Sequence, residues 1–273
     1  MKICIAGKNS IAINAVKHII DCKIVSKDNI LILNNPEDKG LDGWQPSFLK
    51  FAKDNNLSIV EIEALYKIDD LIFVSLEYSQ IIKPHLFHLE ALLLNIHFSL
   101  LPSYKGMYTS AHPILNGEKY SGVTLHKIDE GIDTGDIINQ IRFDIDISDT
   151  ARDLYLKYLK YSFQLFKKNI DNVINKNFNS TPQNSITSTY YSKKSIDYNN
   201  LTIDFKKTSF EIHNQLRAYI FEEYQLPIID NKKIKKSVLL SKKIERNILL
   251  EQEEYFIISG IDNYKILAYK DEN

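Results

Sequence analysis

The feature that most restricts the fold is an alternation of short apolar runs with amphipathic segments through the first half of the chain. Four runs have the composition of buried strands, at Lys2–Ala6, Ile30–Leu33, Leu71–Ser75 and Leu92–His97. Segments with helical spacing, such as Ile11–Ile20 after an expected N-cap at Ser10, separate them. Because parallel strands need long, usually helical connections, this order predicts an α/β fold: a Rossmann-like, mostly parallel sheet with helices on both faces.

Further segments extend this sheet and cover it. A long segment has apolar residues at helical spacing, which indicates an amphipathic helix packed on the sheet. Two strand-like runs separated by a glycine-containing loop indicate a hairpin. The additional elements that we expect are a helix at Ser47–Asp54, a strand at Leu57–Ile62, the hairpin strands Gly122–Ile128 and Ile137–Phe143, and the long helix Thr150–Ile174.

A polar stretch at Lys176–Ser188, which contains Pro182, is the expected boundary between two domains or a long connecting loop. It divides the chain into a larger domain at 1–178 and a smaller mixed or β-rich domain at 179–273. The elements expected in the second domain are a helix at Ser209–Tyr219 and strands at Ser237–Leu240, Tyr255–Ser259 and Tyr264–Ala268.

Composition excludes several classes of protein. The chain has 273 residues, of which 25% are charged, and a net charge of −1, so nothing favours binding to nucleic acid or to an anionic membrane. The lysine run Lys232–Lys236 is typical of a solvated turn rather than of a nucleic-acid site. Cys4 and Cys22 are too few for a disulfide framework, and no apolar segment reaches membrane-spanning length. We therefore expect a cytoplasmic protein.

Polar side chains with catalytic potential stand where the apolar run Leu92–His97 ends. Asn95 and His97 alternate with Ile96, so on a strand both face the same way, and Asp133 lies in a later glycine-containing loop. Open α/β sheets build their sites at the carboxyl ends of the strands. If these three groups converge, they supply an oxyanion donor, a proton carrier and a carboxylate that orients it. Taken singly, Asn95 and His97 are more typical of a polar strand end, and Asp133 of a turn.

The first turn, Gly7 to Ser10, contains a single glycine. A dinucleotide fingerprint needs further glycines for close approach to a pyrophosphate, so NAD, NADP and FAD are disfavoured. The side chains of Asn9 and Ser10 can still meet a ligand, although a purely structural turn is an equal alternative.

The histidines do not indicate a metal site. No single element carries them at a ligand spacing, so we expect no metal. His126, inside the expected strand Gly122–Ile128, is predicted to be a core or interface residue. The histidines considered are His85, His88, His97, His112 and His126.

Four blocks between Asn95 and Ile138 together resemble the folate-dependent formyltransferases, the family of glycinamide ribonucleotide, methionyl-tRNA and sugar N-formyltransferases. They are Asn95-x-His97-x-Ser99-Leu100-Leu101-Pro102, Tyr104-Lys105-Gly106, Gly122-Val123-Thr124-Leu125-His126 and Asp133-x-Gly135-Asp136-Ile137-Ile138. The resemblance implies transfer of a formyl group from 10-formyltetrahydrofolate to an amine, without a metal. It assigns oxyanion stabilisation to Asn95, proton transfer to His97 and orientation of the imidazole or of a water to Asp133.

The same resemblance places the folate pocket on the loop after the strand Leu71–Ser75. The residues expected there are Tyr78, Ser79, Gln80, Ile81 and Ile82, together with Asp136. Ile81 and Ile82 are equally well explained as core residues.

Two aromatic segments point to the acceptor. Trp44, with Gln45 and Ser47, can stack on a base or sugar, or can instead cap the core at a helix start. The segment from Arg217 to Pro227, with Phe221 and Tyr224, is similar to the one with which sugar N-formyltransferases cover a thymidine nucleotide. Substrate contacts are also expected from Lys105, Tyr108, Asn9 and Ser10.

The sequence therefore predicts an N-formyltransferase that acts on the 3- or 4-amino group of a dTDP-linked amino-dideoxyhexose. Its product would enter bacterial surface glycans of the O-antigen or lipopolysaccharide type, and the family implies a homodimer formed by 179–273. Transfer to methionyl-tRNA is the enzymatic alternative, although the basic patch expected of a tRNA binder is absent. A folate-binding regulatory protein is the non-enzymatic one, although it would be expected to lack the set Asn95, His97 and Asp133.

Overall fold

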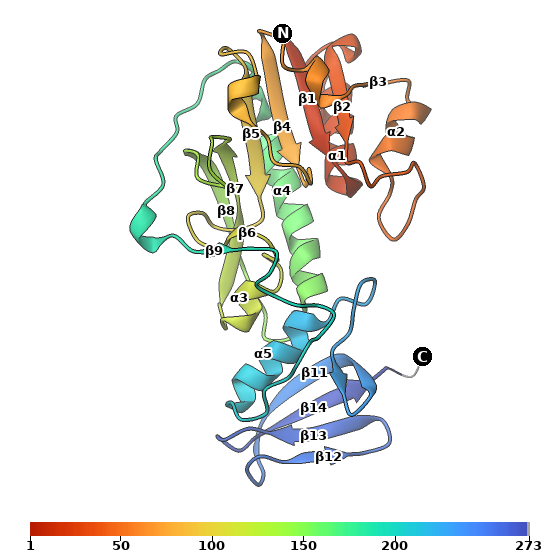
Figure 1. The fold of residues 1–273 in the computed structure, drawn as a ribbon, viewed down its shortest axis with the longest axis vertical. Coiled ribbons are helices and arrows are strands. Elements are labelled where there is room, and N and C mark those ends of the chain that lie inside the picture. Colours follow the sequence, from red (N-terminus) through yellow and green to blue (C-terminus); the bar gives the residue numbers. More distant parts are fainter. Residues whose placement is uncertain (272–273) are drawn as a thin grey trace. The chain divides into compact units, whose positions relative to one another are not determined.

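A seven-stranded sheet forms the frame of the first half of the chain in the computed structural model, which describes residues 1–271 (Figure 1). Strands β1, β2, β3, β4 and β5 pair in parallel, and β7 pairs with β5 in antiparallel orientation. The predicted Rossmann-like, mostly parallel sheet is therefore confirmed. In spatial order the strands are β3 (Ser58–Ile59), β2 (Ile30–Asn34), β1 (Lys2–Gly7), β4 (Leu71–Leu76), β5 (Leu92–His97), β7 (Tyr120–Lys127) and β8 (Ile137–Asp144).

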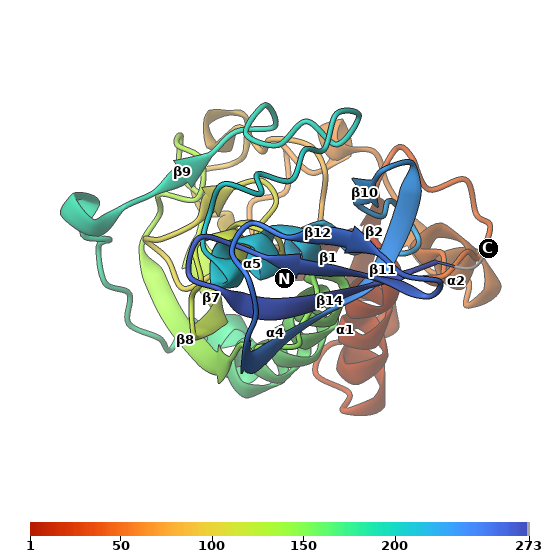
Figure 2. The same ribbon diagram turned by 90° about the horizontal axis from the view of Figure 1, so that it is seen from below.

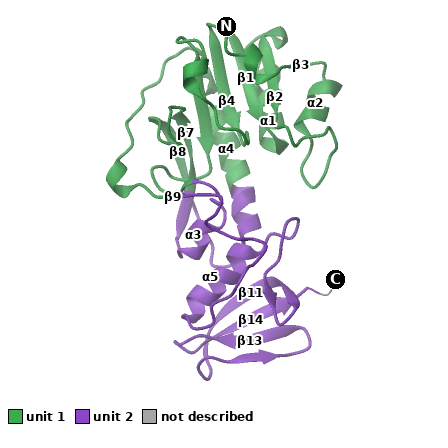
Figure 3. Cartoon of the chain, in the orientation of Figure 1, with its two compact units in different colours: residues 1–105, 122–142, 158–190 green, residues 106–121, 143–157, 191–273 purple. Residues whose placement is uncertain are grey.

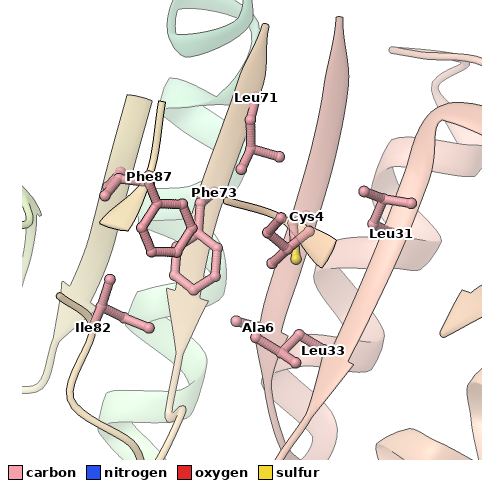
Figure 4. Packing of buried hydrophobic residues seen from close by; sticks show 10 residues of the cluster. Cys4, Ala6, Leu31, Leu33, Leu71, Phe73, Ile82 and Phe87 are labelled. Carbon is pink, nitrogen blue, oxygen red and sulfur yellow. The ribbon is translucent and has the colours of Figure 1, made fainter. Parts of the chain in front are cut away.

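One face of this sheet carries a continuous apolar cluster (Figure 4). Alternate residues of neighbouring strands, such as Cys4, Leu31 and Phe73, point to the same side because side chains of a strand alternate between faces. Ile82 and Phe87, from the connection between β4 and β5, close over them, and the ring of Phe87 meets that of Phe73 edge-on at 5.8 Å. This face is thus covered by loops and short 3-10 turns.

The main helices cover the opposite face. Helix α1 (Asn9–Asp21) and helix α4 (Ala151–Ile174) meet through His18, whose ring lies 6.2 Å from that of Phe163. The buried residues of α1 do not belong to the cluster on the first face, and Ile3 and Ile5 of β1 point away from that cluster. Helical segments therefore lie on both faces of the sheet: the long helices α1 and α4 on one, and only short 3-10 turns on the other.

Two local predictions need correction. Helix α1 begins at Asn9 and its N-cap is Lys8, so the expected cap at Ser10 was wrong. The expected strand Leu57–Ile62 shrinks to β3, because the chain turns into a 3-10 helix at Ile62–Ala64. Helix α2 (Phe48–Asp54) does begin after Ser47, whose Oγ accepts a hydrogen bond from the backbone N–H of Lys50 at 3.0 Å.

By contacts, the described chain divides into two compact units, each assembled from separate stretches (Figure 3). Unit 1 comprises 1–105, 122–142 and 158–190, and unit 2 comprises 106–121, 143–157 and 191–273. The predicted division into domains at 1–178 and 179–273 stays a prediction. The shorter elements are β6 (Lys105–Gly106), β9 (Tyr190–Tyr191) and α3 (His112–Leu115), with 3-10 turns at Lys27–Asn29, Pro84–Leu86 and Ser185–Thr187.

A five-stranded antiparallel sheet and helix α5 (Ser209–Tyr219) build most of unit 2, and both views show α5 against one face of this sheet (Figures 1 and 2). Apolar residues of α5, such as Ile212 and Leu216, pack against Phe256 and Ile266 of the sheet. In spatial order its strands are β10 (Ile228–Ile229), β11 (Lys232–Lys243), β14 (Tyr264–Lys270), β13 (Tyr255–Ser259) and β12 (Leu249–Glu251).

The lysine run Lys232–Lys236 forms the start of β11 and not a turn, so that prediction was wrong. Ile234 in its middle is fully buried in the core, and this apolar residue anchors the strand while the lysines beside it remain exposed.

Among residues 1–271, no helix combines the length and apolar character needed to cross a membrane.

His213 of α5 is a buried histidine whose two ring nitrogens are both engaged. Nε2 lies 2.8 Å from the carbonyl oxygen of Ile147, so it carries the hydrogen, and Nδ1 lies 2.8 Å from Ser237 Oγ. Burial lowers the pKa of His213 to about 4, from an ordinary value of 6.5. Folding therefore favours the neutral ring.

We predict that acidification from pH 6.5 to 4 destabilises the protein through His213, because the unfolded state then binds a proton that the folded state rejects. The loss should reach up to about 3 kcal/mol in the free energy of unfolding. The free energy of unfolding, measured with denaturant at several pH values, should fall less steeply towards pH 4 for His213→Gln than for the wild type. His88→Gln, at an exposed histidine, is the control; parallel profiles for the wild type and His213→Gln would contradict the prediction.

Candidate active site

Strand β5 delivers Asn95 and His97 to the carboxyl edge of the sheet, as predicted. Its antiparallel neighbour β7 places His126 directly across from Asn95, and Thr124 across from His97. Side chains of directly opposed residues share one face of the sheet and lie close together. The pairing of two strands thus brings an amide and two imidazoles into one cluster.

One oxygen of Asp133 is the centre of this cluster. Its Oδ1 lies 3.4 Å from His97 Nδ1, 3.4 Å from Asn95 Nδ2 and 3.6 Å from His126 Nε2. The side chain of Asp133 is 13% exposed and that of His97 is 9% exposed, so the carboxylate acts on its neighbours with little screening by water. The predicted convergence of Asn95, His97 and Asp133 is what the structure shows.

The hydrogen bonds of His97 fix which nitrogen is available for proton transfer. Nε2 lies 2.8 Å from the backbone carbonyl oxygen of Tyr104, which can only accept, so Nε2 carries a hydrogen. The other nitrogen, Nδ1, faces Asp133. Burial lowers the pKa of His97, and the carboxylate of Asp133 opposes this by favouring the charged ring. His97 is therefore neutral near pH 7, with the lone pair of Nδ1 beside a group that stabilises the added proton.

His126 is buried, as expected of the predicted core residue, but it also belongs to the cluster around Asp133, which sequence reasoning missed. Its Nδ1 lies 2.7 Å from the carbonyl oxygen of Lys127 and donates to it, so Nε2 accepts from Asn95 Nδ2 at 3.2 Å. His126 thereby determines which way the Asn95 amide points. The only sequence signal for it was its place in the Gly122–His126 block; its register against β5 is not visible in the sequence.

The loop that carries Asp133 is tightly folded. Asp133 has φ of +54°, in the left-handed region that side chains avoid. Thr134 Oγ1 donates to Asp129 Oδ1 at 2.6 Å, and a Cβ on Gly135 would come within 2.0 Å of the Lys127 carbonyl oxygen. Glycine is required at position 135 by this close approach.

A second polar cluster lies at the carboxyl ends of β1, β2 and β4. Asn9 Nδ2 donates to Glu77 Oε2 at 3.3 Å, and Asn35 Nδ2 donates to the Glu77 carbonyl oxygen at 3.1 Å. Asn35 Oδ1 in turn accepts from the Ser79 N–H at 3.1 Å. The strand order reverses between β1 and β4, which is where open α/β sheets bind ligands. Asn35 and Glu77 were not among the predicted site residues, although Asn35 stands where the second apolar run ends.

Comparison with known proteins agrees with this geometry. The family model described as formyl transferase matches residues 51–170. The solved structure of WlaRD, described as a sugar 3N-formyl transferase in the presence of dTDP and 5-N-formyl-THF, is 55% identical. The comparison covers 100% of this chain and 98% of that one, with a TM-score of 0.96. The chain belongs to the formyltransferase family, among the sugar N-formyltransferases.

Other members of the formyltransferase family are similar to different degrees. An N-formyltransferase from Helicobacter canadensis, solved with folinic acid and dTDP-3-aminofucose, is 50% identical, with 99% of this chain and 100% of that one covered and a TM-score of 0.96. A 4-N formyltransferase from Francisella tularensis is 27% identical, with 82% and 90% covered and a TM-score of 0.67. The methionyl-tRNA formyltransferase of Fervidobacterium nodosum is 35% identical over 66% of this chain and 54% of its own length, so the chain spans about half of the curated relatives that it matches.

The residues that the formyltransferase resemblance assigned to folate lie on unit 1. Ile81 is 72% exposed, whereas Ile82 is 8% exposed and belongs to the core cluster, so the two neighbours differ. Tyr78 Oη donates to Gln80 Oε1 at 3.2 Å, and burial raises the pKa of Tyr78 to about 12. Ser79 Oγ lies 3.1 Å from Glu37 Oε2, and Asp136 Oδ2 accepts from Ser180 Oγ at 3.0 Å. Folate binding by these residues stays a prediction.

Most of the unit 1 residues that were predicted to bind the acceptor are buried or half-buried and make hydrogen bonds within the protein. Gln45 Oε1 accepts from the Ser10 N–H at 3.4 Å, and Trp44 beside it is half-buried. Ser47 is the buried N-cap of α2. Lys105 is 7% exposed, and its backbone N–H donates to the Thr189 carbonyl oxygen at 2.9 Å.

The other predicted acceptor residues belong to unit 2. Arg217 is buried, and its guanidinium donates to the carbonyl oxygens of Asp146 and Asp149 and to Asn214 Oδ1. These internal bonds explain the residue without a ligand, and substrate binding by Arg217 stays a prediction. The exposed Tyr224 contacts Phe221 at 4.8 Å between ring centroids. Tyr108 Oη donates to the Lys193 carbonyl oxygen at 3.2 Å, and its ring meets Tyr198 edge-on.

We predict that Gly135→Ala destabilises the protein, because the added methyl group overlaps the backbone of Lys127 and the loop must shift. Overpacking of this kind costs about 1–3 kcal/mol. Gly43→Ala is the matched control, since a Cβ at Gly43 meets Gln45 O only at 4.0 Å. Denaturant unfolding should separate the two variants, and equal stability of both would show that the loop accommodates the methyl group.

Proposed function

We propose that this protein transfers a formyl group from 10-formyltetrahydrofolate to the C-3 amine of a dTDP-linked 3-amino-dideoxyhexose. The observation that carries the proposal is the similarity, over the full length, to two enzymes solved with dTDP or a dTDP-3-amino sugar, at 55% and 50% identity. The 4-N enzyme is less similar, at 27%. Among these three enzymes, identity is higher to the two described with 3-amino chemistry than to the 4-N enzyme.

The cluster around Asp133 has the groups that this reaction requires. When the amine attacks the formyl carbon, the amine must lose a proton and the folate nitrogen must gain one. His97 can serve both steps: Nδ1 accepts the proton from the amine, Asp133 stabilises the resulting imidazolium, and the same proton passes to the departing folate nitrogen. No further acid or base is needed.

Asn95 is proposed to stabilise the negative oxygen of the tetrahedral intermediate. Its Nδ2 has two hydrogens, one directed to His126 at 3.2 Å and the other towards Asp133 at a longer 3.4 Å. A hydrogen bond of 3.4 Å is weak, so a formyl oxygen that lies in the direction of this second hydrogen can replace Asp133 as its acceptor. His126 keeps the amide in the orientation that makes this possible.

The remaining assignments are proposals on the same basis. Residues 78–82 with Asp136 hold the folate. The sugar nucleotide is contacted by Asn9, Ser10, Trp44, Gln45, Ser47, Lys105, Tyr108, Arg217, Phe221 and Tyr224.

The protein acts in the cytoplasm, where its cysteines remain free thiols, and its product serves bacterial surface glycans. Residues 179–273 form a homodimer contact, supported by exposed apolar side chains such as Leu250 and Ile228 on its sheet, and a stable monomer in sedimentation would contradict this.

The test is a formyl-transfer assay with 10-formyltetrahydrofolate and a panel of acceptors. The panel contains dTDP-linked 3-amino and 4-amino dideoxyhexoses of gluco and galacto configuration, and initiator methionyl-tRNA. Mass spectrometry should detect the gain of one CO unit on a 3-amino sugar. Transfer to a 4-amino sugar alone would overturn the position of the amine, and transfer to tRNA alone would overturn the acceptor class.

We predict that His97→Ala, Asn95→Ala and Asp133→Ala each lower kcat and kcat/KM together, because their interactions develop in the transition state. Loss of the general base should cost about 10²–10⁴-fold, and loss of the oxyanion donor about 10²–10³-fold. In the wild type the acid limb of kcat/KM should lie below the ordinary imidazole pKa of about 6.5, since burial lowers the pKa of His97 and only the neutral ring accepts a proton. His88→Ala, at an exposed histidine, is the control; an effect of His97→Ala on KM alone would refute the assignment.

Trp44→Ala and Tyr224→Ala are predicted to raise KM for the sugar nucleotide while leaving kcat largely intact. Stacking on the nucleotide is present in the ground state as well as in the transition state, so its loss weakens binding uniformly. The expected change is about tenfold, the scale of one aromatic–base stack. Steady-state kinetics with varied sugar nucleotide will show it, and a loss of kcat at unchanged KM would place these residues in the chemistry instead.

A further inference from the structure

A short segment after helix α4 lies along the loop that carries Asp133. This strap, residues 180–183, is joined to the loop by three kinds of hydrogen bond. Ser180 Oγ donates to Asp136 Oδ2 at 3.0 Å, and Thr181 and Ile137 exchange two backbone bonds, each of 2.8 Å, as an isolated antiparallel bridge. The third kind comes from the side chain of Gln183.

Gln183 holds the backbone on both sides of Thr134. Its Nε2 donates to the carbonyl oxygen of Asp133 at 2.9 Å and to that of Gly135 at 2.7 Å. Its Oε1 is buried and finds no hydrogen-bond partner among the described residues. The amide cannot be reversed, because its oxygen would then face two carbonyl oxygens, which only accept. Both hydrogens of one side chain are thus committed to the backbone of this loop.

One of the two residues held in this way, Asp133, has a backbone conformation that non-glycine residues rarely adopt. Asp133 has φ of +54°, and such conformations persist at functional sites only when the surrounding structure enforces them. Rotation of Asp133 out of this region would move Oδ1 away from His97 and Asn95, since the backbone and the side chain share one Cα. The loop is fixed at Thr134 and at Gly135, and Gln183 adds the two bonds that fix the Asp133 and Gly135 carbonyl groups themselves.

We propose that Gln183 is a positioning residue of the active site, which holds Asp133 in the left-handed conformation that presents its carboxylate to His97. The expected effect on turnover rests on the proposed function, whereas the expected effect on the position of Asp133 does not. The unsatisfied Oε1 supports it: a glutamine with a buried, unbonded oxygen is unfavourable unless its two N–H groups are needed. The strap therefore contributes to catalysis without touching a substrate.

The test variant is Gln183→Met, which keeps an unbranched side chain of similar length and removes both donors. Displacement of Asp133 should lower kcat by roughly 10- to 100-fold, the scale expected when a catalytic group is misplaced, with KM for the sugar nucleotide unchanged. Gln252→Met applies the same substitution at an exposed turn and should have no effect. Gln183→Asn retains the amide on a shorter side chain and should fall between the wild type and Gln183→Met.

A measurement without turnover separates this proposal from the proposed function. Burial has the largest effect on the pKa of His97 and lowers it. The Asp133 carboxylate and the Tyr104 carbonyl oxygen favour the charged ring, and His126 and Lys105 oppose it. If Gln183 positions Asp133, Gln183→Met weakens the favourable interaction, and an NMR titration should show the pKa of His97 falling further, in the same direction as in Asp133→Asn. An unchanged His97 titration in folded Gln183→Met would overturn the proposal. Absence of formyl transfer by the wild type would overturn the proposed function alone.

Discussion

The arrangement of the site depends on how the chain returns from β7 to the end of β5. Because β7 runs antiparallel to β5, it ends at Lys127 opposite Leu94, and the next residue, Ile128, bonds to the Leu93 carbonyl oxygen. The chain has therefore already passed the level of His97 and then of Asn95 when it leaves β7. The loop must fold back to bring a carboxylate to them, and it does so with Asp133 at positive φ.

The loop that follows β7 places the Asp133 carboxylate beside His97, and this sets the electrostatics of the cluster. A buried imidazole beside a carboxylate experiences two opposing effects, because burial disfavours its charged form and the anion favours it. For His97 burial is the larger of the two, so the ring remains a base while its conjugate acid has a stabilising neighbour. His126 differs because Nδ1 donates to the Lys127 carbonyl oxygen, which leaves Nε2 as an acceptor for Asn95. The two histidines thus differ in their surroundings: His97 presents a basic nitrogen to a carboxylate, and His126 orients an amide.

The sequence allowed some of these elements to be predicted, and the reason lies in local patterns. The bounds of β5 and α5 agree with the predicted Leu92–His97 and Ser209–Tyr219, because an apolar run ending in polar groups and a well-capped helix are both local signals. The spatial closeness of Asn95, His97 and Asp133 required the resemblance as well, since spacing alone shows only that convergence is possible.

What escaped prediction depended on non-local contacts. His126 belongs to the site through its register against Asn95, and β11 includes the lysine run because Ile234 is buried under α5. Neither strand pairing nor tertiary burial is written in a single stretch of sequence. Gln183 was overlooked for the same reason: it lies in a polar segment that was predicted to be a domain boundary or a connecting loop.

The single glycine of the first turn also has a structural explanation. A Cβ on Gly7 would come within 2.0 Å of the Leu76 carbonyl oxygen, so glycine is required there by the approach of β4 and not by that of a ligand. Two amides of this turn are used internally, from Lys8 to Leu76 O at 3.3 Å and from Ser10 to Gln45 Oε1 at 3.4 Å. A glycine-rich dinucleotide loop leaves such amides open to a pyrophosphate. In this chain two of the corresponding amides already have partners within the protein, so this turn differs from such a loop in more than its glycine content.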